Sequence, residues 1–193
     1  MAENEAEEGD PNVDEDGIQI QSYTAMVLVV VPPKEFAEQT LRHARSSLYN
    51  VHVGTRVVGV NMDDVMTGRL QDEFLVDGVI ADEKMDDYVG VLFVGGEGAM
   101  ELADNADAQR IAREAADRDL MIGAWGHSVA ILAKAGILKG KKVTGADDVG
   151  DLVRKAGGKF TGRQLEKSGK LATCTDEAVG MRFGKTLAQI VAI

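Results

Sequence analysis

Residues 121–133 read MIGAWGHSVAILA, a stretch in which a short apolar run is followed almost at once by an apolar helical pattern. Only Gly126-His127-Ser128 separates the two. A strand that turns sharply into a helix is the place where many α/β proteins hold a catalytic nucleophile. The residue at the sharpest point is Gly126, which has no side chain to attack a substrate. The segment therefore predicts an α/β fold and leaves open whether its turn is catalytic.

Strands alternate with helices in the pattern of the remaining sequence. The run AMVLVVV at 25–31 is continuously apolar and rich in β-branched residues, as expected for a strand buried on both faces of a parallel sheet. Further strands are predicted at 51–60, 89–94, 120–124, 141–144 and 170–174, and helices at 35–48, 104–118, 127–135, 149–156 and 179–193. Segment 73–80 is either a short hairpin or an excursion strand. This alternation predicts a doubly wound, mostly parallel sheet sandwiched by helices.

Composition narrows the class of protein. The chain has 193 residues, a length that suits one domain, which we assign to 23–193. Residues 1–22 are rich in acidic side chains and poor in apolar ones, so we predict a disordered acidic tail. The net charge of −11 makes nucleic acid and anionic membranes poor partners. The longest early apolar run is too short to cross a bilayer, and the acidic N-terminus differs from a secretory signal, so we expect a cytoplasmic protein.

Three predicted strand ends carry groups capable of chemistry. Ligands of parallel sheets bind at the carboxyl ends of the strands. Glu35 and Glu38 follow the first strand, Gly95 and Gly96 follow the strand at 89–94, and His127 follows the strand at 120–124. Each has a structural alternative: first-turn charges that complement a helix dipole, a tight turn, and a packed histidine. Their occurrence on three strand ends favours a site.

The motifs at these places resemble the DJ-1/PfpI superfamily, which is related to class I glutamine amidotransferases. DYVGVLFVGGEGA at 87–99 is similar to its "DYDALVLPGGxGA" segment, and AWGH at 124–127 to its "AxCH" elbow. AILAKAGIL at 130–138 is similar to "AVLAxAGLL", and KGKKVTG at 139–145 to "KGRKVTG". Several motifs in the right order are far more specific than any one of them.

The resemblance implies a flavodoxin-like sandwich, usually a homodimer. We expect no metal and no cofactor. It implies catalytic roles for Glu38 and His127, with Glu35 in a neighbouring acidic position. It also implies that the Gly95 and Gly96 amides, together with Trp125 and Gly126, border a pocket for a small polar or carbonyl ligand.

Two departures from the family pattern bear on function. Gly126 occupies the position of the elbow cysteine, the nucleophile of the family's covalent chemistry. The "TSRGPG" loop reads TCTDEA at 173–178, so its arginine is missing and two acids are present. Cys174 is either a relocated nucleophile or a small buried residue. The loss of a nucleophile removes nearly all catalysis, on the order of a millionfold in one hydrolase.

Three hypotheses follow from these departures. The first is a non-catalytic binding or interaction module with a degenerate active site, a pseudoenzyme. The second is a cysteine-independent hydrolase or lyase, similar to a glyoxalase or deglycase, that uses Glu38 and His127 on a small carbonyl compound. The third is a stress-related chaperone in which the acidic tail supplies solubility.

Overall fold

The computed structural model describes residues 23–33, 38–62, 66–67, 73–74 and 76–192. The predicted tail at 1–22 and the predicted site residue Glu35 lie outside the described residues. Seven strands form the main sheet in the order β10-β11-β7-β6-β1-β2-β5. All neighbouring strands pair in parallel except β10 and β11, which are antiparallel. The predicted mostly parallel α/β sheet is confirmed.

The central strands are β1 (Ala25–Val30), β6 (Gly90–Phe93) and β7 (Met121–Trp125). They are flanked by β2 (Val53–Gly59) with β5 (Gly78–Val79) on one side and by β11 (Leu171–Cys174) with β10 (Leu165–Ser168) on the other. Alternate residues of β1 enter two different core clusters, with Val27 and Val29 on one face and Leu28 and Val30 on the other. This alternation explains why the strand reads as continuously apolar.

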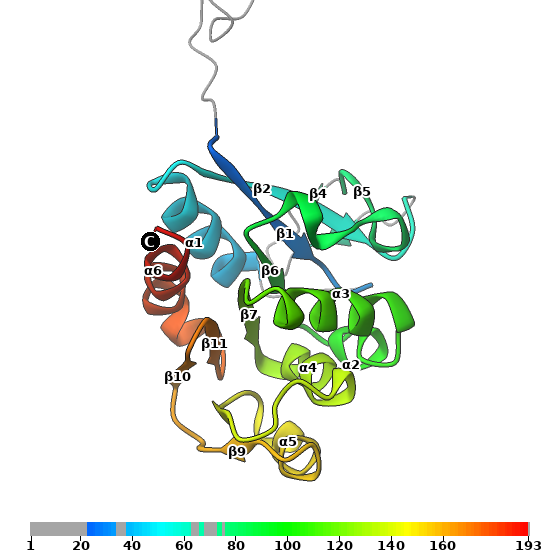
Figure 1. The fold of residues 1–193 in the computed structure, drawn as a ribbon, viewed down its shortest axis with the longest axis vertical. Coiled ribbons are helices and arrows are strands. Elements are labelled where there is room, and N and C mark those ends of the chain that lie inside the picture. The colour runs from blue at the N-terminus through cyan, green and yellow to red at the C-terminus, as the bar shows by residue number, and fades with distance from the viewer. Residues whose placement is uncertain (1–22, 34–37, 63–65, 68–72, 75, 193) are drawn as a thin grey trace, which may run out of the picture.

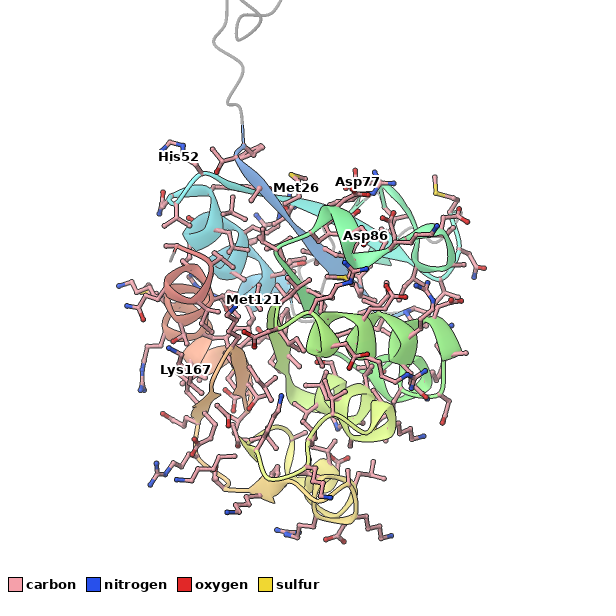
Figure 2. The ribbon with its side chains drawn as sticks, in the orientation of Figure 1. Met26, His52, Asp77, Asp86, Met121 and Lys167 are labelled. Carbon is pink, nitrogen blue, oxygen red and sulfur yellow. The ribbon has the colours of Figure 1, made fainter. Side chains whose placement is uncertain are left out.

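Helices cover both faces of the sheet (Figure 1). The pair α1 (Glu38–Tyr49) and α6 (Gly180–Val191) packs on one face, where their apolar side chains join the cluster that contains Val27. On the other face lie α2 (Ala99–Leu102), α3 (Ala106–Asp117), α4 (Val129–Ala135) and α5 (Gly150–Lys155). Side chains fill the space between the layers, while His52 and Lys167 lie exposed at the periphery (Figure 2).

Two predicted segments differ in detail from the structure. The strand expected at 141–144 is β8 (Lys142–Val143), which pairs with β9 (Lys159–Phe160) in a separate small sheet rather than in the main one. Segment 73–80 holds two short strands that do not pair with each other as a hairpin: β4 (Glu73–Phe74) pairs antiparallel with β3 (Met66–Thr67), outside the segment, and β5 becomes the edge of the main sheet. Periodicity cannot decide which sheet a two-residue strand joins, because pairing is a tertiary property.

Candidate functional site

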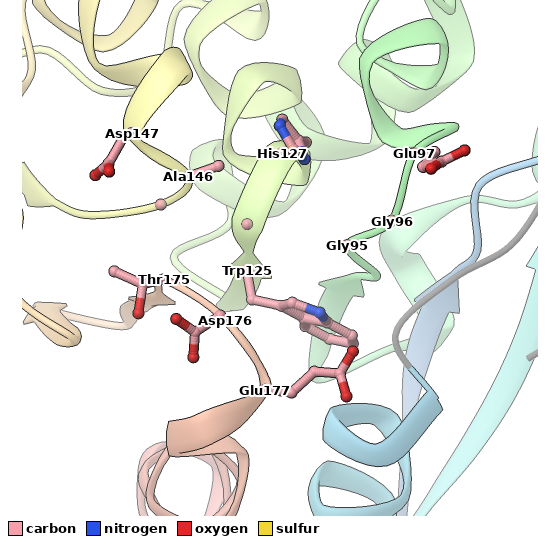
Figure 3. Close-up of a pocket in the computed structure, with 12 residues that line it drawn as sticks. Gly95, Gly96, Glu97, Trp125, His127, Ala146, Asp147, Thr175, Asp176 and Glu177 are labelled. Carbon is pink, nitrogen blue, oxygen red and sulfur yellow. The ribbon is translucent and has the colours of Figure 1, made fainter. Parts of the chain in front are cut away.

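A pocket of about 420 Å³ lies at the carboxyl ends of the strands (Figure 3). Four three-residue segments line it, at 95–97, 125–127, 145–147 and 175–177. These segments lie at or just after the ends of β6, β7, β8 and β11. The pocket therefore occupies the edge of the sheet where parallel α/β proteins bind ligands.

The chain turns sharply at Gly126, the central residue of the pocket's second segment. Its φ is +59°, in the left-handed region that favours glycine. A Cβ built there would meet one atom within 4 Å, the carbonyl oxygen of Thr175 at 3.5 Å, which is an ordinary contact. The elbow therefore has room for a side chain, but it holds a backbone conformation that L-residues adopt only with strain.

The buried Ser128 holds this elbow in place. Its Oγ lies 2.8 Å from the carbonyl oxygen of Phe93 and accepts a hydrogen bond of 3.1 Å from the backbone N–H of Trp125. The hydroxyl therefore connects the ends of β6 and β7 directly beneath the pocket. Sequence reasoning did not assign Ser128 a role. The preference of serine for the first turn of a helix is the signal that points to it.

Hydrogen bonds also fix the other two segments. The backbone N–H of Ala146 donates to the carbonyl oxygen of Gly126 (3.2 Å), which seats segment 145–147 against the elbow. The N–H of Thr144 donates to the Oγ1 of Thr173 on β11 (2.9 Å). In segment 175–177, the Oδ1 of Asp176 accepts from the N–H of Ala178 (2.8 Å). The pocket walls are thus built from hydrogen-bonded turns on rigid strands.

Trp125 lies at the base of the pocket and is only 1% exposed. Its ring makes an edge contact with Phe183 of α6, with ring centroids 5.9 Å apart. A Cβ on Gly95 would lie 2.8 Å from the indole Nε1, so residue 95 must be glycine for the ring to fit. The indole N–H has no hydrogen-bond partner among the described residues. It is therefore a buried donor at the wall of a pocket.

His127 stands on the opposite side of the pocket from the indole ring (Figure 3). Its Nε2 lies 3.1 Å from the Oδ2 of Asp148, which follows the third lining segment. Both side chains are partly exposed, at 37% and 68%. A carboxylate in this position orients the imidazole ring by a hydrogen bond.

Glu38 is the first residue of α1 and is 1% exposed. Neither carboxyl oxygen has a hydrogen-bond partner among the described residues. Glu38 is not one of the residues that line the pocket. A buried carboxyl group without a partner is costly, so this position remains a functional candidate although it does not line the pocket.

Cys174 ends strand β11 and is completely buried. Burial raises the pKa of its thiol far above the ordinary value, and the nearby Asp176 raises it further. The thiol is therefore protonated at neutral pH and is a poor nucleophile. Of the two alternatives for this cysteine, the structure favours the small buried residue.

The structure brings five of the predicted site residues to one pocket: Gly95, Gly96, Trp125, Gly126 and His127. It places Glu38 outside the lining. The acidic residues of the pocket were mostly missed. Asp176 and Glu177 stand out in the sequence only as departures from a family loop, and nothing in the local pattern of Glu97 or Asp147 distinguishes them from ordinary surface charges.

None of the described helices has both the length and the apolar character needed to span a membrane.

Comparison with known proteins identifies relatives over nearly all of the described chain. The model of the DJ-1/PfpI family matches residues 25–190. An uncharacterized protein of Methanocaldococcus jannaschii is 30% identical over 163 residues, which cover 83% of this chain and 79% of that one.

Solved structures give the same picture at the level of the fold. A ThiJ/PfpI domain protein from Brachyspira murdochii superposes with a TM-score of 0.82 at 21% identity, covering 88% of this chain and 97% of the other. DJ-1beta of Drosophila melanogaster superposes with a TM-score of 0.77 at 20% identity, covering 87% and 90% of the two chains.

Proposed function

This chain belongs to the DJ-1/PfpI family, and we propose that it is a non-catalytic member, a pseudoenzyme that binds a small molecule in the pocket at its elbow. The observation that carries the proposal is Gly126. It stands at the sharp turn, with φ at +59°, where the family pattern has its cysteine. Glycine supplies no atom that can form a covalent intermediate.

No other thiol takes over the missing role. Cys174 is the only cysteine of the chain, and it is buried, protonated at neutral pH and absent from the pocket lining. Covalent chemistry through sulfur is therefore unsupported at this site. What the pocket retains is shape and polarity: a buried aromatic base, glycine backbone and a ring of charged side chains.

The experiment is an assay of methylglyoxal consumption and of deglycation by the purified full chain, alongside its Cys174→Ser variant. We expect no consumption beyond that in buffer from either protein. Turnover that disappears in Cys174→Ser would overturn the proposal, because it would mean that the buried thiol reaches a substrate.

The second candidate function is thiol-independent hydrolysis or lyase chemistry, and two observations favour it. The imidazole of His127 is oriented by Asp148 at 3.1 Å, and Glu38 is a buried carboxyl group without a partner among the described residues. Such groups are able to act as general acid and base. Turnover that survives Cys174→Ser but is lost in both Glu38→Gln and His127→Ala would establish this function instead.

We also propose that the protein forms a homodimer. Light scattering on the eluting protein would then give twice the 20.6 kDa mass of the chain. A single-chain mass at micromolar concentration would contradict it.

A further inference from the structure

We propose that the ligand of this pocket is a small organic cation, an ammonium compound that also carries a hydrogen-bond acceptor. The inference rests on the proposed function, in that it names the chemical class of molecule that the pocket binds. It is carried by two independent features of the lining: the sign of its charges and a buried N–H donor without a partner.

Negative charge surrounds the pocket. Three of its four lining segments contribute carboxylates: Glu97, Asp147, and the pair Asp176 and Glu177. The remaining segment contributes His127, whose ring faces a further carboxylate, that of Asp148. The pocket lining that the structure describes includes no lysine or arginine. A concave site lined by one sign of charge concentrates ligands of the opposite sign.

Two of these carboxylates are available to a ligand. Glu97 and Asp147 are exposed at the rim, and neither makes an ion pair or a side-chain hydrogen bond with another described residue. Asp176 uses Oδ1 to cap the turn that follows it. Figure 3 shows Glu97 and Asp147 on opposite sides of the opening, with His127 between them. An ammonium group entering the pocket would pass between these two acids.

The second feature is the indole N–H of Trp125 at the base of the pocket. The side chain is 1% exposed, and its Nε1 has no acceptor among the described residues. In Figure 3 the nitrogen lies on the ring edge that faces Gly95 and the pocket above it. A buried donor left unpaired is costly, so a ligand that offers an oxygen there gains a hydrogen bond. An ammonium group alone has no lone pair to accept this bond, which is why the ligand needs an acceptor as well.

A metal ion fits this lining less well than an organic cation. Among the described residues, no group of three or more histidine, cysteine, aspartate or glutamate side chains is close enough to hold a metal. The carboxylates are spread around an opening rather than gathered at a point. Spread negative charge above an apolar and hydrogen-bonding base suits a molecule with one charged end.

The test uses four small linear probes that separate charge from hydrogen bonding. The compound 5-aminopentanamide is a cation with an amide acceptor, hexanamide is its neutral analogue, and adipamate is its anionic analogue. Pentylamine is a cation without the acceptor. Because Trp125 is the only tryptophan of the chain, the indole region of a ¹⁵N-correlated NMR spectrum holds a single signal, which reports binding at this site alone. Cation binding to acidic residues elsewhere would leave that signal in place.

We expect 5-aminopentanamide to shift the indole signal in a saturable way, and to bind more tightly than hexanamide, pentylamine or adipamate. Its affinity should fall as the salt concentration rises, because exposed charges are screened. The double variant Glu97→Gln with Asp147→Asn should weaken its binding by about threefold or more, the effect of removing two exposed attractions. In calorimetry, Trp125→Phe should reduce the advantage of 5-aminopentanamide over pentylamine.

The matched control is Asp82→Asn with Asp117→Asn, which removes the same charge from exposed acids that do not line the pocket. This control should leave the affinity within about a factor of two, since distant exposed charges are largely screened. Equal weakening by both double variants would overturn the inference, because net charge rather than the pocket would then attract the cation.

The remaining outcomes distinguish failure of the inferred preference for cations from failure of the proposed non-catalytic function. If hexanamide or adipamate shifts the indole signal as strongly as 5-aminopentanamide, the inference is wrong, while a small-molecule site is still supported. If none of the four probes shifts it, the inference is also wrong. Turnover in the methylglyoxal assay would overturn the non-catalytic function whatever the charge preference of the pocket.

Discussion

Replacement of Gly126 by alanine tests the geometry of the elbow quantitatively. The new Cβ has room, because its one close neighbour is the Thr175 carbonyl oxygen at 3.5 Å. The backbone conformation supplies the penalty, since a φ of +59° disfavours an L-residue by about 1–2 kcal/mol. For a domain of this length that corresponds to a decrease in Tm of about 2–8 °C. We therefore expect a moderate loss of stability.

The assay is urea unfolding followed by circular dichroism, so that the probe does not depend on the neighbouring tryptophan. Gly136→Ala is the matched control: its φ is +77° and no atom lies within 4 Å of the new Cβ, so it should lose a similar amount. Gly98→Ala is the contrasting case, since its Cβ would lie 1.8 Å from the carbonyl oxygen of Pro33. It should lose about 3 kcal/mol or more, because the backbone must move.

Two results would refute the reasoning about the elbow. A loss at Gly126 as large as that at Gly98 would mean that the elbow is closed to side chains. No loss at all would mean that its φ is not positive. Gly126→Cys extends the test, because the introduced thiol should carry the same penalty and should react with a thiol reagent in the folded protein.

Three further predictions concern buried and paired groups. Ser128→Ala should lower the free energy of unfolding by about 1–3 kcal/mol in urea titrations, because it leaves a buried strand-end amide unpaired, whereas Thr186→Ala on an exposed helix face should have little effect. Cys174 should be unreactive toward Ellman's reagent at pH 8 until urea unfolds the chain, and rapid labelling of the folded protein would contradict its burial. Burial raises the pKa of Glu114, but hydrogen bonds from Arg110 and from a backbone amide lower it by more, so its net pKa lies below the ordinary value. The Arg110–Glu114 ion pair thus stabilises the fold at neutral pH, and this stabilisation is lost as the pH falls through the lowered pKa of Glu114. The difference in free energy of unfolding between wild type and Glu114→Gln should therefore narrow below about pH 4. A difference independent of pH would contradict the ion pair.

Much of the fold could be predicted because its strands are buried on both faces. Strand β1 is apolar along its whole length since alternate residues enter two cores, and such a run is typical of a central strand in a parallel sheet. The helices α1, α3 and α6 likewise show apolar positions at helical spacing. The short strands β8 and β9 show no such pattern. The sequence therefore could not predict that they form a separate sheet.

The candidate site was predicted in part. The sequence predicted Gly95, Gly96 and segment 125–127, because glycine and histidine at the end of a strand indicate a binding or catalytic site. Glu38 is buried at the start of α1 and is not among the residues that line the pocket, so its predicted catalytic role stays a prediction.

The sequence by itself determined that this is an α/β protein with a sharp turn at Gly126 and no thiol at that turn. Only the tertiary structure decided what surrounds the turn. Segments 95–97, 145–147 and 175–177 lie far apart in the chain. Parallel pairing of the main sheet brings the first and the last of them to one edge, and the hydrogen bond from the Ala146 N–H to the Gly126 carbonyl oxygen seats the middle one beside them. In the sequence, each of their carboxylates looks like an ordinary surface charge. Once gathered around one pocket, above the unpaired N–H of Trp125, they define the charge of the molecule that fits there.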